Sequence, residues 1–255
     1  MTTIDRNGVR IYYEHHASGD PGARAILLSH GYSATSAMWT GQIEALTRNH
    51  HLITWDMRGH GQSDSPDDPD LYSERHTVED MAAILDACGV SEAVAGGLSL
   101  GGYMTLAFHL ARPERCTALM LFDTGPGYKN AEGRAGWNRT AEARAAAFES
   151  HGLAALGTGQ EVRISQHRSA QGLAHAARGM LAQVDDRVIQ SLPAIRMPTL
   201  VLAGADDQAF RIPTDYMARK IPGAQKVVLE GAGHAANIDQ PAAFNAAVTG
   251  FLAGL

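Results

Sequence analysis

The sequence predicts an α/β fold in which helices cover both faces of a mostly parallel sheet. Two observations support this class. Short apolar runs with strand character alternate with longer amphipathic stretches through residues 1–125, and the same alternation returns after residue 198. Such alternation is typical of parallel strands joined by helical crossovers, which are almost always right-handed.

Eight strands are predicted, and the first two form a hairpin. Residues 2–5 and 10–17 flank Asn7-Gly8, a dipeptide that favours the tight turn of a hairpin. The other six runs are continuously apolar or β-branched, as expected of strands that are buried on both faces. They are residues 24–30, 51–56, 92–98, 116–123, 199–203 and 225–230.

The amphipathic stretches between these runs predict helices. Thr77 and Asp80 have the spacing of a capping box, which favours a helix start, and Gly89 stands where a C-terminal cap is expected. Pro113 requires the helix before it to end, because proline lacks the N–H that a helix interior needs. The predicted helices are residues 77–89, 99–112, 213–221 and 240–255.

The middle of the chain breaks this alternation. Residues 129–193 are rich in Ala, Arg and Gln, contain no run with strand character, and favour helix by propensity. We therefore expect one core domain, formed by residues 1–128 and 194–255, with a small helical cap inserted after the sixth strand. A cap above the carboxyl edge of the sheet would cover the place where α/β proteins bind ligands. Helices that only add packing are the alternative.

Composition and charge exclude several classes of protein. With 255 residues, of which 45% are apolar and 19% charged, the chain can bury a large core and is not disordered. The net charge of −6 provides no basic surface for nucleic acid or an anionic membrane. Two cysteines are too few for a disulfide scaffold or a four-thiolate zinc site. With no signal peptide and no long apolar run, the sequence predicts a cytoplasmic protein.

The strongest chemical motif is the Gly-Leu-Ser-Leu-Gly of residues 97–101, which joins a predicted strand to a predicted helix. In this context a G-x-S-x-G motif forms a nucleophile elbow, a tight turn that exposes the hydroxyl of Ser99. The helix that begins there directs N–H groups and the positive end of its dipole toward developing negative charge. An ordinary glycine-rich turn or a dinucleotide loop is the alternative, although no G-x-G-x-x-G and no P-loop lysine is present.

Two further segments provide partners for this serine. His234 follows the last predicted strand in a Gly-Ala-Gly-His sequence, so its loop can carry the imidazole over the elbow. An acid is needed to orient that histidine. Asp207, after the seventh strand, is the predicted acid, with Asp206 as the near alternative and Asp123 as a third. The resulting chain order is Ser, Asp, His.

A backbone oxyanion hole is also predicted. Such a hole needs two N–H groups aimed at the oxygen of a tetrahedral intermediate. We expect one from Leu100, directly after the serine, and one from Tyr32, which follows His30-Gly31 at the end of the third strand.

Together these motifs resemble the α/β-hydrolase superfamily over nearly the whole chain. Residues 56–64, Asp-Met-Arg-Gly-His-Gly-Gln-Ser-Asp, are similar to the D-x-R-G-x-G-x-S segment that shapes a loop beside the pocket in that family. The resemblance implies an α/β-hydrolase fold with an eight-stranded sheet. It also favours Asp207 over Asp206, because the family's acid usually stands three residues after the glycine that ends its strand. Within the superfamily, the chain most resembles small-cap carboxylesterases, enol-lactonases and cofactor-free haloperoxidase-like enzymes.

The expected activity is hydrolysis of a small carboxylic ester or lactone through an acyl-enzyme, without metal or cofactor. A serine nucleophile argues against haloalkane dehalogenase and epoxide hydrolase chemistry. A C–C bond hydrolase or perhydrolase on the same residues, and a non-catalytic ligand receptor, are the alternatives. No nucleic acid or membrane partner is expected, and the sequence leaves the oligomeric state open. The side chains expected to line the pocket are Trp39, Tyr103, Trp137 and Phe148, with core packing as their alternative role.

Overall fold

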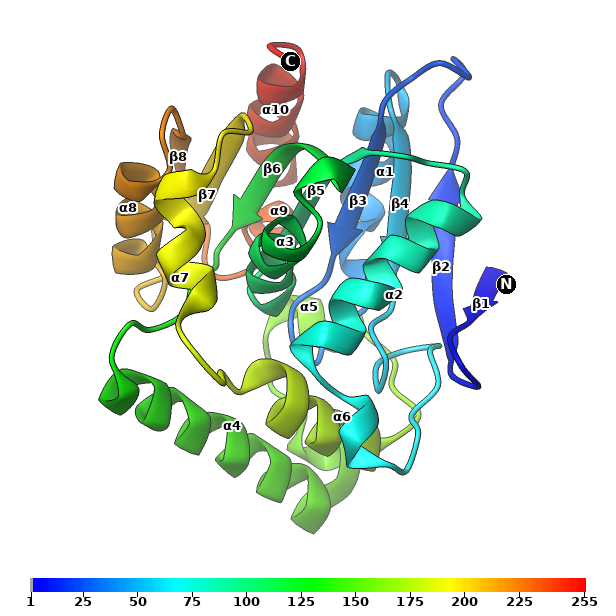
Figure 1. Cartoon of the computed structure of the whole chain (residues 1–255), viewed down its shortest axis with the longest axis vertical. Coiled ribbons are helices and arrows are strands. Elements are labelled where there is room, and N and C mark those ends of the chain that lie inside the picture. Colours follow the sequence, from blue (N-terminus) through cyan, green and yellow to red (C-terminus); the bar gives the residue numbers. More distant parts are fainter. Residues whose placement is uncertain (1) are drawn as a thin grey trace.

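The computed structural model describes residues 2–255 (Figure 1), and its centre is a single sheet of eight strands. The strand order is β1-β2-β4-β3-β5-β6-β7-β8. Strands β1, β2 and β4 pair antiparallel, and every other neighbouring pair is parallel. The predicted mostly parallel, eight-stranded sheet is therefore confirmed.

Each strand lies within one residue of its predicted bounds. The central strands β3, β5, β6 and β7 are almost entirely buried, which explains their apolar sequences, because successive side chains of a central strand enter the core on opposite faces of the sheet. The strands are β1 Thr2–Asp5, β2 Arg10–His16, β3 Ala25–Ser29, β4 His51–Trp55, β5 Ala93–Leu98, β6 Cys116–Phe122, β7 Thr199–Gly204 and β8 Gln225–Leu229.

The first hairpin forms as its turn sequence predicts. Asn7 and Gly8 both have positive φ angles, 56° and 86°, as a type I′ turn requires. Asp5 and Arg10 are the pair of residues next to this turn in the register of β1 and β2.

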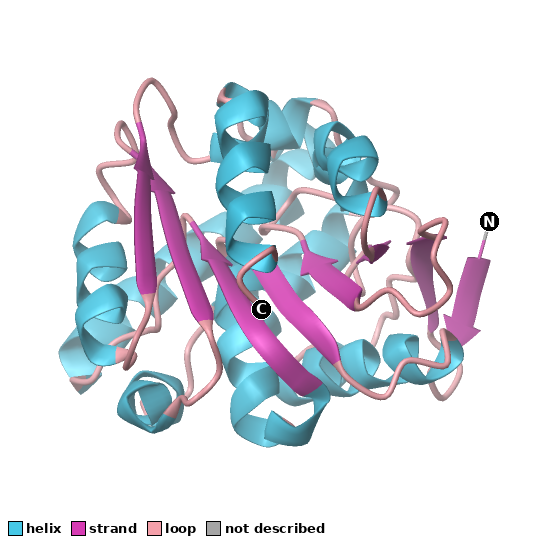
Figure 2. Cartoon of the chain, turned by 90° about the horizontal axis from the view of Figure 1, so that it is seen from above, coloured by secondary structure: helices cyan, strands magenta, loops and turns pink. Residues whose placement is uncertain are grey.

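Helices cover both faces of the sheet (Figure 2). Buried side chains of α2, α3 and α8 belong to the core on one face, and those of α1 and α10 belong to the core on the other. The helices are α1 Thr40–Thr47, α2 Glu74–Ala87, α3 Leu100–Ala111, α4 Ala131–His151, α5 Gln160–Arg163, α6 Ala170–Ala176, α7 Arg187–Ser191, α8 Arg211–Lys220, α9 Ala236–Asp239 and α10 Pro241–Leu252.

The predicted capping box of α2 is wrong. The helix begins at Glu74, and the hydroxyl of Ser73 accepts a hydrogen bond from the His76 N–H at 3.1 Å, which makes Ser73 the N-cap. Thr77 lies in the second turn, where its hydroxyl donates to the Ser73 carbonyl at 2.9 Å. The Asp80 carboxylate does not cap the helix, because it pairs with two arginines.

Asp80 pairs with Arg6, whose Nε donates to Oδ1 at 3.2 Å, and with Arg58, which is buried as Asp80 is. Arg58 donates from Nε and Nη2 to the two carboxylate oxygens, at 2.8 and 2.7 Å. We expect Asp80→Ala to lower the free energy of unfolding by about 3–5 kcal/mol, because it leaves a buried guanidinium without its counter-charge. Urea denaturation measures this loss.

The matched control for that experiment is Glu79→Ala. The Glu79 carboxylate pairs with Arg6 and Arg75 at 3.6 and 3.3 Å near the surface, and such pairs contribute less than about 1 kcal/mol. Equal losses for the two variants would contradict a structural role for the buried pair.

Helix α1 has no counterpart among the predicted helices. Its buried residues are Gln42 and Leu46, and only one of them is apolar. The sequence of α1 therefore lacks the apolar periodicity by which a helix is predicted. Gln42 is buried because its amide donates to the Asn237 carbonyl at 3.0 Å, a contact that tertiary structure supplies. The helix predicted over residues 240–255 forms as α10, Pro241–Leu252, and the short helix α9 before it was not predicted.

Between β6 and β7 the chain forms helices and turns only. In Figure 1 the long helix α4 crosses beneath the carboxyl ends of the parallel strands, and it packs against α6. Within residues 2–255, no helix has both the length and the apolar character needed to cross a membrane.

Candidate active site

Ser99 occupies a strained turn between β5 and α3. Its φ and ψ are 55° and −117°, a conformation that a residue with a side chain rarely adopts. A Cβ built on Gly97 would overlap the main chain of Gly101, and one built on Gly101 would overlap the carbonyl oxygen of Ser29. The turn is therefore possible only with glycine on both sides of the serine, which is the geometry of a nucleophile elbow.

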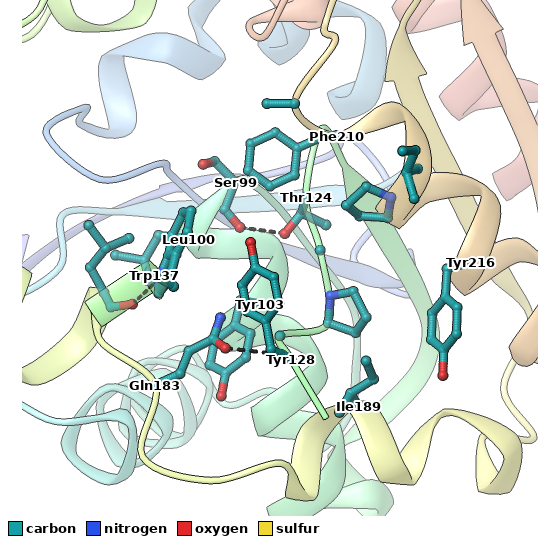
Figure 3. A pocket seen from close by; sticks show the side chains of 17 residues that line it. Ser99, Leu100, Tyr103, Thr124, Tyr128, Trp137, Gln183, Ile189, Phe210 and Tyr216 are labelled. Carbon is teal, nitrogen blue, oxygen red and sulfur yellow. Dashed lines mark hydrogen bonds between the residues drawn. The ribbon is translucent and has the colours of Figure 1, made fainter. Parts of the chain in front are cut away.

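The main chain of Ser99 is held on both sides. Its N–H donates to the Phe122 carbonyl at 3.0 Å. Its carbonyl accepts from the Tyr103 N–H at 3.1 Å and from the Thr124 hydroxyl at 2.6 Å (Figure 3). These bonds to β6, α3 and the loop after β6 keep the serine in its strained conformation.

The loop after β3 lies against this turn. A Cβ built on Gly31 would be 3.4 Å from the Cβ of Ser99, so the following residue, Tyr32, is close to the elbow. Within residues 2–255, the backbone N–H groups of Tyr32 and Leu100 have no protein acceptor. The first N–H groups of a helix always lack a partner within the helix, which leaves that of Leu100 available to a ligand.

His30 and the side chain of Tyr32 fix this loop. The Met57 N–H donates to His30 Nε2 at 2.9 Å, so the proton of the neutral ring is on Nδ1. Nδ1 donates this proton to the Gly31 carbonyl at 2.7 Å. Burial lowers the pKa of His30 and keeps the ring neutral. The Tyr32 hydroxyl donates to the Leu173 carbonyl of α6 at 2.8 Å.

His234 and Asp207 form a hydrogen-bonded pair. Nδ1 of His234 lies 2.6 Å from Oδ2 of Asp207, which is buried after β7. Burial by itself lowers the pKa of His234, but the hydrogen bond to Asp207 and the charges of Asp207 and Asp123 raise it above its ordinary value. Asp206 is exposed and makes no such contact.

The structure does not bring Ser99 and His234 into a hydrogen bond. Among the described residues, the Ser99 hydroxyl donates to no acceptor. Phe210 connects the two segments, because it lines the same cavity as Ser99 and stacks on His234 with ring centroids 5.0 Å apart. In unliganded enzymes such catalytic contacts are often long and shorten when substrate binds.

Asp123, the third candidate acid, has a different environment. It is fully buried after β6, where Oδ1 accepts from the Gly204 N–H at 2.7 Å. Oδ2 has no partner within residues 2–255. Burial raises the pKa of Asp123 to about 8, although the hydrogen bond from Gly204 and the charge of His234 oppose it. The hydrogen bond from Gly204 connects the loop after β6 to β7.

Ser99 opens into a cavity of about 310 Å³ (Figure 3). Its walls come from α3, the loop after β6, the helical segment before β7, and α8. None of the described residues that line it is charged. The large side chains of the wall are Tyr103, Tyr128, Trp137, Ile189, Phe210 and Tyr216.

Two of the four predicted pocket residues, Tyr103 and Trp137, lie on this wall. The prediction for Trp39 is wrong, because the turn before α1 directs its ring into the core beside Phe122 and Phe244. The prediction for Phe148 is also wrong. Its ring faces Tyr32 and lines a separate cavity of about 240 Å³.

Several wall residues were not predicted. Thr124 and Phe210 follow β6 and β7 at the carboxyl edge of the sheet, and this position is a signal by which the sequence identifies them. Gln183 has no comparable signal, since it lies in an irregular part of the segment between β6 and β7. Among residues 2–255, no cluster of three or more His, Cys, Asp or Glu side chains is arranged to hold a metal ion.

Comparison with known proteins identifies relatives of this chain. A family model described as the alpha/beta hydrolase fold matches residues 24–158. The 3-oxoadipate enol-lactonase 1 of Acinetobacter baylyi is 31% identical, over 92% of this chain and 91% of its own. A putative carbamate hydrolase, RutD, of Pseudomonas savastanoi is 29% identical, over 95% of this chain and 98% of its own.

Solved structures show the same architecture. A thermophilic esterase from Thermogutta terrifontis superposes with a TM-score of 0.81 at 29% identity, covering 99% of this chain and 97% of that one. The enol-lactonase from Burkholderia xenovorans LB400 superposes with a TM-score of 0.80 at 24% identity, covering 99% and 100% of the two chains. The chain belongs to the alpha/beta hydrolase fold family.

Proposed function

We propose that this protein is a serine hydrolase that cleaves carboxylic esters or lactones through an acyl-enzyme. The observation that carries the proposal is the strained Ser99 in an uncharged cavity, with the His234–Asp207 pair on neighbouring loops. Ser99 Oγ attacks the carbonyl carbon while His234 Nε2 takes its proton. Asp207 holds the proton of Nδ1 and stabilises the imidazolium that forms.

The remaining steps use the same groups. The N–H groups of Tyr32 and Leu100 hydrogen-bond the oxyanion of the tetrahedral intermediate. His234 returns its proton to the leaving alkoxide, and the acyl group stays on Ser99. His234 then takes a proton from water, whose oxygen attacks the acyl carbon, and the acid leaves as the proton returns to Ser99.

In this proposal residues 129–193 are a cap on a core formed by residues 1–128 and 194–255. The segment contributes Trp137 and Ile189 to the wall of the cavity. A wall of this kind excludes water from the reacting groups, which strengthens the electrostatic interactions between them.

The cavity favours a neutral substrate. Burying a carboxylate without a charged partner is costly, and no lining residue provides one. A lactone derived from 3-oxoadipate, a dicarboxylic acid, keeps a free carboxylate and fits this wall poorly. Carbamates share the carbonyl chemistry and are the second substrate class to test, because relatives bear that name.

Labelling by a fluorophosphonate probe tests the nucleophile. One adduct per chain is expected, at Ser99, because the probe reacts with an activated serine. A panel of neutral esters, lactones, carbamates and vinylogous diketones, with and without peroxide, then separates ester hydrolysis from C–C cleavage and perhydrolysis. Labelling without turnover on any member would favour a ligand receptor.

The pH dependence tests the base. Only neutral His234 accepts the serine proton, and Asp207 raises the pKa of the histidine. Protonation therefore begins at a higher pH than in an isolated histidine, and kcat/KM on a neutral ester is expected to fall on the acid side with a midpoint above pH 6.5. Initial rates measured between about pH 5 and 9 locate this midpoint. A flat profile, or a midpoint below that of free histidine, would contradict the assignment.

A further inference from the structure

One polar side chain in the cavity wall, that of Gln183, takes no part in the proposed hydrolysis. Gln183 lies just after the π-helical turn Ala177–Leu181 and is 9% exposed. It lines the same cavity as Ser99. Turns of this type are frequent at functional sites.

The orientation of the Gln183 amide is determined by its neighbour. The Tyr128 N–H donates to Oε1 at 3.2 Å. Because an N–H can only donate, the oxygen must face Tyr128, and the NH₂ group is turned the other way (Figure 3). Within residues 2–255, Nε2 donates to no acceptor, although it carries two hydrogens.

The main chain of Gln183 is also held. Asn138 of α4 accepts from the Gln183 N–H through Oδ1 at 2.8 Å, and its Nδ2 donates to the Gln183 carbonyl at 2.9 Å. A Cβ built on Gly127 would lie 2.9 Å from Oε1, so the loop after β6 packs closely on the amide. The donor is thus in place before a ligand arrives, and little conformational entropy is lost when it binds.

Other buried donors of the wall are already satisfied. The Tyr103 hydroxyl donates to Glu74 at 2.9 Å, the Trp137 indole N–H to the Leu181 carbonyl at 2.7 Å, and the Thr124 hydroxyl to Ser99. Gln183 therefore presents a free, oriented donor in a mainly apolar cavity. A ligand that displaces water from this donor without replacing its hydrogen bond loses affinity.

We propose that Gln183 is a specificity residue that selects substrates with a second, neutral hydrogen-bond acceptor. The substrate class is an uncharged ester or lactone that carries a ketone or ether oxygen apart from the scissile carbonyl. This inference rests on the proposed hydrolysis at Ser99. The Gln183 NH₂ group donates to that oxygen, and the apolar wall holds the rest of the substrate.

Matched substrates test the inference. A series of aryl oxoalkanoates, with the ketone at successive positions along the chain, is compared with the aryl alkanoates of equal length. Wild-type protein is expected to show a higher kcat/KM for at least one oxoalkanoate than for its alkanoate. Gln183→Met, which keeps the length of the side chain, is expected to lower kcat/KM for that oxoalkanoate by about 10- to 100-fold and to change the alkanoate by less than about threefold.

Two further variants complete the design. Gln190→Met makes the same substitution at an exposed glutamine of α7 and is expected to leave both substrates unchanged. Gln183→Glu keeps an oxygen for Tyr128 but replaces the donor by an acceptor, and is expected to abolish the preference for the oxoalkanoate. This second variant provides the test if the methionine variant does not fold.

The outcomes separate the two proposals. If the fluorophosphonate probe does not label wild-type Ser99, the proposed hydrolysis fails. If labelling and turnover are normal but no oxoalkanoate is preferred, or Gln183→Met slows both substrates equally, the role of Gln183 is overturned and the hydrolase proposal stands. A selective loss with unchanged labelling supports the role of Gln183.

Discussion

Ser99→Ala is expected to lower kcat on a neutral ester by about a millionfold, the scale on which hydrolases of this mechanism depend on their nucleophile. Without Oγ no acyl-enzyme forms, and only the oxyanion donors and substrate binding remain to assist water. The same variant is expected to lose the fluorophosphonate adduct. Turnover rates and the mass of the intact protein measure the two effects.

A control must separate chemistry from backbone strain. Ser33 also has a positive φ, 57°, so Ser33→Ala makes the same substitution at a second serine with a positive φ. This control is expected to retain kcat within a few-fold. Labelling that survives in Ser99→Ala, or equal losses in the two variants, would contradict the assignment of Ser99 as nucleophile.

Asp207→Asn is expected to lower kcat by about 10⁴-fold, with little effect on the fold. An asparagine amide at this position donates to His234 Nδ1, so the ring proton is held on Nε2, which can no longer accept the proton of Ser99. The loss therefore comes from the wrong histidine tautomer. Steady-state kinetics measures it, and circular dichroism checks the fold.

Asp206→Asn is the matched control, because Asp206 is the exposed neighbour of Asp207. Its kcat is expected to stay within about threefold of wild type, as is usual for a surface substitution. A larger loss of kcat in Asp206→Asn than in Asp207→Asn would assign the catalytic acid to Asp206. Small losses in both variants, with a large loss in Asp123→Asn, would assign the acid to the residue after β6.

Features whose determinants lie close together in the chain could be predicted from the sequence. The strands follow from runs of apolar and β-branched residues, and the turn at Ser99 follows from glycines two positions away on each side. The His234–Asp207 contact could be predicted from the sequence only indirectly. The order of the motifs places both loops at the carboxyl edge of the sheet, and the family resemblance favours Asp207 over Asp206.

Errors arose where a distant contact overrides a local pattern. Asp80 has the spacing of a capping residue, yet it lies opposite a buried Arg58 and pairs with it. Gln42 is buried because it reaches Asn237, so α1 lacks the apolar pattern that predicts a helix. The ring of Trp39 is aromatic and close in sequence to the oxyanion loop, but its turn directs it into the core behind the sheet.

The sequence by itself determined the α/β class, the strand positions, the elbow at Ser99 and the order of the candidate catalytic residues, because each depends on side chains within a few positions of one another or on topology. Only the tertiary structure decided which aromatic rings line the cavity and that no charge lies on its wall. It alone showed the free donor of Gln183, since that orientation depends on Tyr128 and Asn138, which are far from Gln183 in the chain. No local pattern encodes such contacts, because they form only when separate elements pack together.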